Sequence, residues 1–566
     1  MDKSLIDSLI GLYNGLFQDA VANHPTFRED CERDLSRLIA LSQKFGTVLF
    51  TTMLPDLDKI LLRSLEAGAL TTHGEPLTRP INGRTRVPRL FQAFWLAIFD
   101  KSGCLKHDVD PSDVQLFHTI LRAAKKLSLE CPEKATYAAV KEYYDIDNSL
   151  PPPSLLWDGD GSDLDGTYCG TLVDIAGPET GLYSGCLPED SRRVLLLCQQ
   201  VADRVSVALG EYLPQRHRFR HGPGAVSDLK TGVGFKYDFP SWSGRLSFVF
   251  PIEEFGLPNS STWLNSGHES AGLASHDEAS ILYAVPKTQT APRLIAAEPV
   301  CNQWCQQSVR SFLTDAIAKT PAGLSIDFSR QDLSGDLALR GSDNGLVATV
   351  DLSSASDRLS CFVVERLFRK NLSLLRALIA SRTRFVVNNI DKKSPKLHKL
   401  RKFSSMGSAL TFPIQSLAFY IVCVSAGFLA EGHQLGDLAG LSRQVRVYGD
   451  DLIVPVSWMP RVRQLLELLG LRINDAKTFQ NGKFRESCGT DAYAGHDVSP
   501  GQVREFYAES KPSTLSSVVQ TANNLYLKGF WHAASALLSP IPGMVRQLIP
   551  TVPIGSGTFG LISSMG

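Results

Sequence analysis

The sequence lacks the cysteine pairing and the charge excess that mark several classes of protein. Its eleven cysteines include no CxxC pair. The closest spacing is Cys301 to Cys305, and without a second pair nearby we expect reduced, partly buried thiols. The 58 basic and 58 acidic residues cancel. This balance argues against a simple basic coat for nucleic acid, but it allows an acidic site inside a basic channel.

Signal-peptide and membrane-span patterns are also missing. The N-terminal segment MDKSLIDSLIGLYNGLF carries acidic residues early and has no cleavage-site pattern. The most apolar stretch, Leu410 to Ala430, is interrupted by Thr411, Pro413 and Gln415. We therefore predict a buried core helix there, and no membrane partner.

The organisation of the chain suggests several packed units. A chain of 566 residues is too long for one core and predicts roughly two to four units. Helical spacing dominates up to about residue 145, and the Pro- and Gly-rich stretch 146–190 predicts a long loop or a domain boundary. Between residues 346 and 500, strand-like runs alternate with helices, which predicts an α+β domain around a small sheet. The alternating segments are Leu346–Val350, Thr411–Ala426, Val445–Val454 and Val462–Leu469.

The most informative segment is a predicted β-hairpin that carries two adjacent carboxylates at its tip. In Val445-Arg-Val-Tyr-Gly-Asp-Asp-Leu-Ile-Val, two apolar, β-branched runs flank a tight Gly-Asp turn. Asp450 and Asp451 would repel each other there unless a cation is bound. Taken alone, an ordinary solvated turn explains the segment equally well.

A second acidic strand end favours a metal site. Leu346-Val-Ala-Thr-Val-Asp351 is an apolar strand that ends in an aspartate, and Ser353–Asp357 then looks like a helix start. Two such strand ends can deliver Asp351, Asp450 and Asp451 to one cavity. These hard oxygen ligands suit two Mg²⁺ ions about 3.5–4 Å apart, with Mn²⁺ as a possible substitute.

A glycine loop lies between the two acidic elements. It runs from Phe403 to Gln415, where Gly407 permits close backbone approach and Pro413 suits the first turn of a helix. Such a loop could hold a template base or the incoming ribose. An ordinary junction between a loop and a core helix explains it as well.

In this order, the three segments resemble motifs A, B and C of viral RNA-dependent RNA polymerases. The likeness is closest to the replicase catalytic (beta) subunit of the single-stranded RNA bacteriophages, the levivirus family. The segments that carry it are Ala348–Asp357, Ser404–Gly407 with Thr411-Phe412, and Val447–Asp451. Further segments resemble motifs D, E and F of that family and another stretch of it: Lys477-Thr-Phe, Phe484–Gly489, Val285-Pro-Lys with Arg293–Pro299, and His221–Ala225.

The resemblance implies an α+β, right-hand polymerase fold with fingers, palm and thumb. It divides the chain into a mostly helical region that contributes to fingers and partner docking (1–200), fingers with motif F (201–345), a palm with motifs A to E (346–500), and a thumb with a C-terminal tail (501–566). The implied palm is a small antiparallel sheet with helices.

The implied activity is that of an RNA-directed RNA polymerase, a nucleotidyltransferase that uses two metals. It would extend an RNA 3′-OH on a template and replicate a viral positive-strand genome in the bacterial host cytoplasm. The implied partners are template and product RNA, ribonucleoside triphosphates, the host elongation factors Tu and Ts, and a ribosomal RNA-binding protein.

The resemblance also assigns roles to single residues. It makes Asp351, Asp450 and Asp451 the metal ligands, and Lys477 a general acid for the leaving pyrophosphate. Lys287 and Arg293 would clamp the triphosphate. The other residues expected to bind nucleotide or RNA are Ser356, Asp357, Gly407, Thr411 and Gln415.

The sequence departs from many viral polymerases at the residues that read the sugar. Met406 stands where motif B usually has Ser, and Gln415 stands where it has Asn. The second motif A aspartate follows Asp351 by six residues rather than five, a spacing that the phage family shares. Either Asp357 or Ser356 is therefore expected to read the ribose 2′-OH.

Two rival functions and one charged segment stay open at this stage. A reverse transcriptase is disfavoured by the small, polar Ser353–Asp357 segment, and a non-catalytic RNA-binding protein with a polymerase-like fold is disfavoured by the intact carboxylates. Eight Lys or Arg residues lie between Arg382 and Lys402, with Asp391 as the acidic residue among them. This run predicts either a solvated face or a contact with template RNA.

Overall fold

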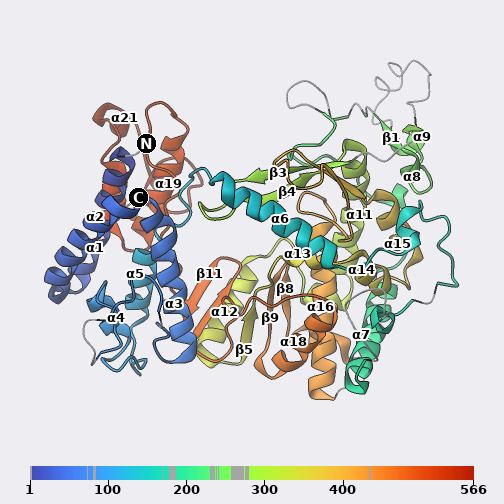
Figure 1. The fold of residues 1–566 in the computed structure, drawn as a ribbon, viewed down its shortest axis with the longest axis horizontal. Coiled ribbons are helices and arrows are strands. Elements are labelled where there is room, and N and C mark those ends of the chain that lie inside the picture. Colours follow the sequence, from blue (N-terminus) through green and yellow to red (C-terminus); the bar gives the residue numbers. More distant parts are fainter. Residues whose placement is uncertain are drawn as a thin grey trace.

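The computed structural model describes residues 3–72, 74–80, 85–168, 170–176, 187–229, 236–237, 239, 241–256, 273–274, 279–432 and 435–565. Helices and several small sheets alternate along the chain (Figure 1). The expectation of a mixed α and β protein is confirmed. Within the described part, none of the nine cysteines forms a disulfide, as expected from their spacing.

The two ends of the chain pack together as one unit, seen in blue and red in Figure 1. Apolar residues from 9–127 and 479–549 share a single core. The N-terminal helices are α1 (Lys3–Asn23), α2 (Arg28–Phe45), α3 (Leu54–Ala67), α4 (Gln92–Ile98) and α5 (Pro111–Arg122), with short helical turns η1 (Pro25–Phe27) and η2 (Leu49–Met53). The C-terminal elements are α19 (Thr514–Leu527), α20 (Trp531–Leu538), α21 (Gly543–Gln547), β13 (Thr551–Pro553) and β14 (Leu561–Ser563).

Helix α1 lies directly against α20. A Cβ added at Gly15 would stand 2.8 Å from the Ala533 Cα, so the two backbones approach more closely than a side chain allows. The Asp19 carboxylate accepts hydrogen bonds from the backbone N–H groups of His532 and Ala533 at 2.8 and 3.0 Å. It therefore satisfies donors at the start of α20 that have no partner within that helix.

The C-terminal tail folds onto its own unit. Strands β13 and β14 pair in parallel, and the Asn523 side chain on α19 bridges to them. Its Nδ2 donates to the Gly560 carbonyl at 2.8 Å, and its Oδ1 accepts from the Ile562 N–H at 2.9 Å. The tail thus contributes to the unit formed by the two chain ends.

The central sheet consists of β5 (Val347–Val350), β9 (Asp451–Pro455) and β8 (Arg446–Tyr448), in that order and antiparallel. The β8–β9 hairpin and the β5 strand lie where the sequence predicted them. A separate antiparallel sheet of β10 (Phe484–Ser487), β11 (Thr490–Tyr493) and β12 (His496–Asp497) follows in the chain.

Another sheet, in the order β4-β3-β6-β7, is covered by α6 (Glu133–Ser149). Val140, Tyr143 and Tyr144 of α6 pack against buried residues of this sheet and of the segment that follows it. The strands are β3 (Ser280–Val285), β4 (Arg293–Ala297), β6 (Phe385–Asn388) and β7 (Leu397–Lys399). Figure 1 shows α6 crossing from the terminal unit toward the rest of the molecule.

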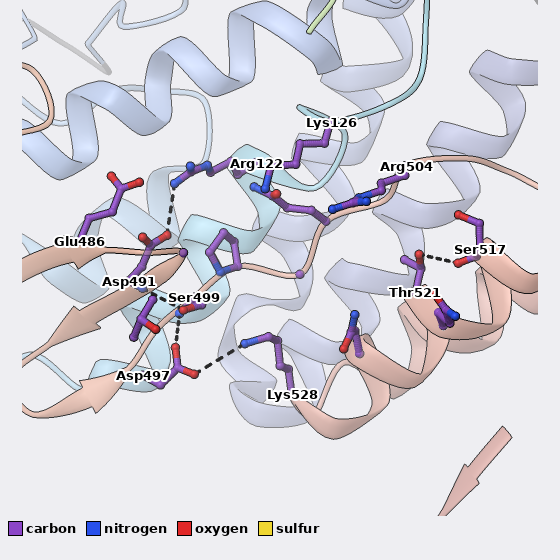
Figure 2. A pocket seen from close by; sticks show the side chains of 17 residues that line it. Arg122, Lys126, Glu486, Asp491, Asp497, Ser499, Arg504, Ser517, Thr521 and Lys528 are labelled. Atoms are coloured by element: carbon purple, nitrogen blue, oxygen red, sulfur yellow. Dashed lines mark hydrogen bonds and ion pairs between the residues drawn. The ribbon is translucent and has the colours of Figure 1, made fainter. Parts of the chain in front are cut away.

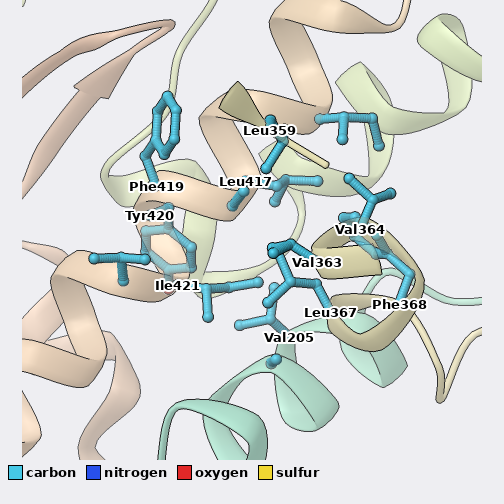
Figure 3. Close-up of a cluster of buried hydrophobic side chains, with 14 of the residues drawn as sticks. Val205, Leu359, Val363, Val364, Leu367, Phe368, Leu417, Phe419, Tyr420 and Ile421 are labelled. Atoms are coloured by element: carbon cyan, nitrogen blue, oxygen red, sulfur yellow. The ribbon is translucent and has the colours of Figure 1, made fainter. Parts of the chain in front are cut away.

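Helix α16 (Thr411–Glu431) runs through the largest core. Figure 3 shows its Leu417 and Ile421 side chains facing Val363 of α14 (Cys361–Leu367) and Val205 of α7 (Glu189–Ala208). Among the helices in the described ranges, α16 is the one long and apolar enough to cross a membrane, yet 89% of its apolar window is buried in the protein. The predicted core helix is confirmed.

The remaining elements surround this core. The helices are α8 (Gly244–Ser247), α9 (Ile252–Phe255), α11 (Val300–Ala318), α12 (Asp332–Asn344), α13 (Ala355–Arg358), α15 (Leu372–Ser381), α17 (Leu438–Ser442) and α18 (Met459–Leu468). The short turns and the small parallel pair are η3 (Leu155–Asp158), η4 (Leu172–Ala176), η5 (Pro214–Arg216), η6 (Pro321–Leu324), η7 (Leu435–Asp437), η8 (Val456–Trp458), β1 (Trp242–Ser243) and β2 (Leu273–Ala274).

Two of the apolar runs are helices, as their alternation with strands predicted. The run Val462–Leu469 lies almost entirely in α18, where Val462, Leu465 and Leu466 are buried. Their spacing of three and four residues places them on one helical face, and Pro460 occupies the first turn. The run Thr411–Ala426 likewise belongs to the core helix α16.

Candidate active site

The three aspartates predicted as metal ligands lie at neighbouring strand ends. Asp351 directly follows β5, and Asp450 and Asp451 close the β8–β9 hairpin. In the register of the sheet, Val350 lies opposite Leu452, so Asp351 and Asp451 emerge from adjacent strands at the same edge. The chain thus brings together the carboxylates that the sequence predicted to share a cavity.

The hairpin tip is fixed by its contact with α16. Gly449 has a φ of +65°, and a Cβ there would lie 2.5 Å from the Phe412 ring. Its N–H donates to the Ser416 hydroxyl at 3.1 Å, and the Tyr448 ring packs edge-on against Phe412. Only glycine fits this turn, and the packing holds the exposed Asp450 at the tip.

The carboxylates lie close enough to perturb one another. Burial, together with the neighbouring Asp450 and Asp351, raises the pKa of Asp451 to about 6. Burial also raises the pKa of Asp351, with Asp450 adding to the effect while Lys477 and Asn474 oppose it. Crowded carboxylates of this kind favour a bound cation.

Two groups that sequence reasoning missed orient these carboxylates. Asn474 Nδ2 donates to Asp351 Oδ2 at 2.7 Å, and the Cys488 N–H donates to Asp451 Oδ2 at 3.1 Å. Cys488 has a φ of +52°, a conformation that non-glycine residues seldom adopt, in the turn between β10 and β11. The sequence does not indicate which backbone N–H will act as a donor. Asn474, however, lies three residues before Lys477 and could have been noticed as a polar residue close to the predicted site.

The donor chemistry of the site fits a hard divalent cation. Asp351, Asp450 and Asp451 offer carboxylate oxygens, which Mg²⁺ and Mn²⁺ prefer, and their mutual repulsion is relieved by positive charge. Within the described residues, however, no group of three or more His, Cys, Asp or Glu side chains forms a ready ligand cluster. The three aspartates therefore offer ligand oxygens but do not form a preassembled ligand cluster.

A cavity of about 780 Å³ opens beside these carboxylates. Asp351 and Asp450 line one part of it, and Lys287, Arg293 and Lys477 line another. The Lys477 ammonium lies 3.9 Å from Asp351 Oδ2. One cavity thus joins an acidic region to three cations, an arrangement that can hold a polyphosphate and a metal together.

The cations of the cavity differ in their electrostatic setting. Burial lowers the pKa of Lys287, and Arg293 and Lys477 lower it further. For Lys477, burial acts in the same direction, but Glu486 and Asp351 outweigh it and raise the pKa above its usual value. Lys477 therefore remains a charged proton donor near the carboxylates.

The glycine loop before α16 docks on strand β4. A Cβ at Gly407 would lie only 1.9 Å from the Ala296 carbonyl oxygen, and the φ of Gly407 is +127°. The Ala296 N–H donates to the Met406 carbonyl at 2.7 Å. The predicted close backbone approach at Gly407 is present, and its partner is the strand that starts at Arg293.

Thr411 and Gln415 both line the cavity but are used differently. The Thr411 hydroxyl is buried and donates to the Ser405 carbonyl at 2.7 Å, so it holds the loop. Gln415 is 6% exposed, and its Oε1 has no hydrogen-bond partner among the described residues. Of the two side chains, Gln415 therefore has an acceptor oxygen that can bond a ligand.

Ser356 and Asp357 lie at the wall of the same cavity. The Asp357 carboxylate pairs with Lys402 at 2.9 Å. The two candidates for reading the sugar are therefore close neighbours in space as well as in sequence.

The basic run 382–402 is largely structural. The buried Arg382 guanidinium donates to three backbone carbonyls, and Arg401 donates to two. Arg384 and Lys399 pair with Asp158, and Lys402 pairs with Asp357. Lys392, Lys393 and Lys396 of this run are exposed.

A second pocket, of about 560 Å³, lies where the two chain ends meet the β10–β11 hairpin (Figure 2). Arg122, Lys126 and Arg504 line one side of it. Polar side chains of α19 line another, among them Ser517 and Thr521. Glu486 from β10 also lines this pocket and raises the pKa of Lys477, which connects it electrostatically with the carboxylate cavity.

Comparison with known proteins finds a family similar to the region from residue 265 to residue 541. Residues 265–541 match the family described as RNA replicase, beta-chain. The matched segment contains β5, the β8–β9 hairpin and α16, and therefore the whole carboxylate cavity apart from the part contributed by α6. Over these residues the chain is similar to replicase beta-chains, and the resemblance to the RNA phage replicases predicted from the sequence is confirmed.

Individual relatives agree with the family match. The RNA-directed RNA polymerase beta chain of Enterobacteria phage GA is 33% identical over 259 residues, 46% of this chain and 43% of that protein. The corresponding subunit of Escherichia virus Qbeta is 30% identical over 339 residues, 57% of this chain and 53% of that protein. The beta chain of Escherichia phage MS2 is 33% identical over 244 residues, 43% and 40% of the two chains. The alignments thus span about half the length of these relatives.

Among solved structures, the RNA-dependent RNA polymerase of a human picorbirnavirus aligns with a TM-score of 0.34 and 14% identity. The alignment covers 48% of this chain and 59% of that one. A likeness at this level adds nothing to the fold assignment.

Proposed function

We propose that this protein is an RNA-directed RNA polymerase that replicates the positive-strand RNA genome of a bacteriophage. The observation that carries the proposal is the cavity in which Asp351 and Asp450 face Lys287 and Arg293. The names of the matched relatives support the same activity. The reaction is template-directed transfer of a nucleotidyl group to an RNA 3′-OH, with release of pyrophosphate.

Two divalent cations, Mg²⁺ or Mn²⁺, held by Asp351, Asp450 and Asp451 would activate the attacking 3′-hydroxyl and stabilise the leaving pyrophosphate. Asn474 Nδ2 and the Cys488 N–H donate to the Oδ2 atoms of Asp351 and Asp451 and so orient these carboxylates.

The cations of the cavity wall act on the triphosphate. Arg293 offers a bidentate fork and Lys287 a point charge. Lys477 keeps a proton on Nζ close to Asp351 and donates it to the departing pyrophosphate as a general acid. Each role is implied by the family resemblance, and the charge and position of the residue in the cavity support it.

The nucleotide and template are held by the loop before α16 and by the end of motif A. Gln415, with its unpartnered Oε1, contacts the nucleotide directly, while Thr411 and Gly407 act by holding the loop in shape. Asp357 reads the ribose 2′-OH, with Ser356 beside it as the alternative.

We propose the right-hand division implied by the family resemblance, with one change. Residues 201–345 form fingers with motif F, and residues 346–500 form the palm. The thumb includes 501–566 and also the N-terminal helices, because residues 9–127 share the core of the C-terminal helices. Within 1–200, α6 is the part that reaches the fingers sheet.

We place the protein in the bacterial host cytoplasm, where template RNA and ribonucleotides are available. The family resemblance proposes the elongation factors Tu and Ts and a ribosomal RNA-binding protein as partners. Affinity purification from infected cells, followed by identification of the bound proteins, tests this part. Absence of these host proteins from the purified complex would contradict it.

An assay of the same purified complex distinguishes an RNA polymerase from a reverse transcriptase. Given an RNA template and either rNTPs or dNTPs, it is expected to extend RNA with rNTPs. A strong preference for dNTPs would instead indicate a reverse transcriptase. Template binding without any synthesis would favour a non-catalytic RNA-binding protein.

A further inference from the structure

Lys402 is a fully buried lysine immediately before the glycine loop. Its side chain has 0% exposure, and its Nζ lies 2.9 Å from Asp357 Oδ1. The same ammonium lies 3.3 Å from the centroid of the Tyr143 ring, which belongs to α6. A buried ammonium is costly unless it is paired, and here one carboxylate and one aromatic face receive it.

The charge on Lys402 is maintained by its surroundings. Burial acts to lower its pKa, but Tyr143, Asp357 and Asp147 outweigh that effect and raise the pKa above the usual value. Asp147 Oδ1 also accepts the Lys402 backbone N–H at 2.9 Å. Helix α6 therefore fixes both the backbone and the side chain of this lysine.

Asp357 is held at one oxygen and available at the other. Lys402 engages Oδ1, while no described residue donates a hydrogen bond to Oδ2. The side chain keeps 17% exposure, and Asp357 lines the carboxylate cavity. A fixed, charged carboxylate with one open oxygen is an acceptor for a ligand hydroxyl.

The cover of Lys402 is also tied to the glycine loop. The Tyr143 hydroxyl bonds to the Ser405 hydroxyl at 2.6 Å, and the Ser405 carbonyl accepts from Thr411 at 2.7 Å. Lys402, Tyr143 and the loop thus form one continuous contact between the end of motif A and motif B.

We propose that Lys402, covered by Tyr143, is a positioning residue for sugar discrimination. It holds the Asp357 carboxylate oriented so that the open oxygen accepts a hydrogen bond from the 2′-OH of the incoming ribonucleotide. The proposal rests on the proposed polymerase function. A site built to bond a hydroxyl discriminates against the analogue that lacks it, because its buried acceptor is then left unpaired.

The test measures kcat/KM for an rNTP and for the matching 2′-dNTP on one template, using the complex purified from infected-host extracts. Lys402→Met keeps the length of the side chain and removes its charge. We expect the rNTP/dNTP ratio to fall by about 10–100-fold, mainly through a higher KM for the rNTP. Lys402→Arg retains the charge and should recover part of the ratio.

Matched variants separate positioning from folding. Lys399→Met removes an exposed lysine of the same segment, which pairs with Asp158, and should leave the ratio unchanged. Tyr143→Leu exposes Lys402 without removing it and should lower the ratio by a smaller factor. In the Lys402→Met background, Asp357→Asn should add little.

The outcomes are distinct. A ratio within twofold of wild type in both Lys402→Met and Tyr143→Leu, whether or not overall activity falls, overturns the proposal. If the wild-type complex makes no RNA, the proposed function fails instead. A selective fall in the ratio, with synthesis from dNTP preserved, supports the positioning role.

Discussion

Single residues decide how closely the backbones around the cavity approach. Gly407 places the motif B loop against Ala296 of β4, where a Cβ would overlap the carbonyl oxygen at 1.9 Å. Gly449 likewise admits the hairpin tip beside Phe412. The shape of the cavity therefore depends on two positions that carry no functional group.

Replacing Gly407 with alanine is expected to destabilise the protein by roughly 2–4 kcal/mol, because the overlap adds to the strain of a positive φ. The matched control is Gly345→Ala, where φ is +69° but nothing lies within 4 Å of the added Cβ. The control should cost only about 1 kcal/mol. Urea unfolding measures both, and equal losses would contradict the close contact with β4.

At this scale the sequence predicted the carboxylates and missed their supports. Asp351, Asp450 and Asp451 were found because acidic residues at strand ends are readable in a linear pattern. Asn474 and Lys402 act across long stretches of chain, and the Cys488 contribution is a backbone N–H. Lys402 was one of eight cations in a basic run, and only burial distinguishes it from the exposed lysines.

Helices α3 and α5 meet strand β11 at a buried cluster of charged side chains. His118 of α5 contacts Asp58 of α3 and lies 2.8 Å from Asp491 of β11, while Arg122 lies 3.2 Å from Asp491. Burial acts to lower the pKa of His118, but the two aspartates raise it to about 9. The imidazolium therefore joins the unit formed by the two chain ends to the β10–β11 hairpin. The turn of that hairpin donates the Cys488 N–H to Asp451.

This cluster predicts a pH-dependent stability. Because the folded-state pKa of His118 lies above the unfolded value of about 6.5, its contribution is fully present below that pH and is lost as the pH rises through 9. Between pH 6.5 and 9, the wild-type unfolding free energy should fall by roughly 2–4 kcal/mol relative to His118→Gln.

Urea titrations of both proteins at several pH values measure the difference. The His118→Gln variant retains Lys125, whose pKa burial lowers to about 8, so the comparison isolates the histidine. Parallel pH profiles for the two proteins would contradict a charged His118 in the folded state.

Secondary structure was predictable where the pattern was simple. The β8–β9 hairpin followed from a turn signal, and the core helix α16 followed from a long, mainly apolar run. The run Val462–Leu469, predicted as a helix between strands, is helix α18, because its apolar residues lie three and four positions apart. The structural use of the basic run was not predictable, since its partners, such as Asp147 and Asp158, lie more than 200 residues away.

On the scale of the whole molecule, the two chain ends form one unit beside the rest of the protein (Figure 1). No local pattern predicts that α1 packs on α20, because the contact joins residues some 500 positions apart. The unit borders the second pocket and reaches Asp491 through His118. We therefore expect substitutions that destabilise the unit formed by the two chain ends to perturb the carboxylate cavity as well.

Gly15→Ala tests this union. The added methyl would meet the Ala533 backbone at 2.8 Å, so we expect a loss of about 1–3 kcal/mol and faster amide exchange in α19 and α20. Gly11→Ala on the same helix meets nothing within 4 Å and should be neutral or stabilising by up to about 1 kcal/mol. Similar exchange rates in both variants would show that α1 does not support the C-terminal helices.

The central claim is that the carboxylate cavity makes RNA. The most direct measurement is incorporation of labelled rNTPs on an RNA template with Mg²⁺, comparing wild type, Asp450→Asn and the exposed-site control Asp336→Asn. The account predicts that Asp450→Asn falls below about 1% of wild-type synthesis while RNA affinity stays within about twofold, and that the control is unaffected. Synthesis by Asp450→Asn at the wild-type rate would contradict it.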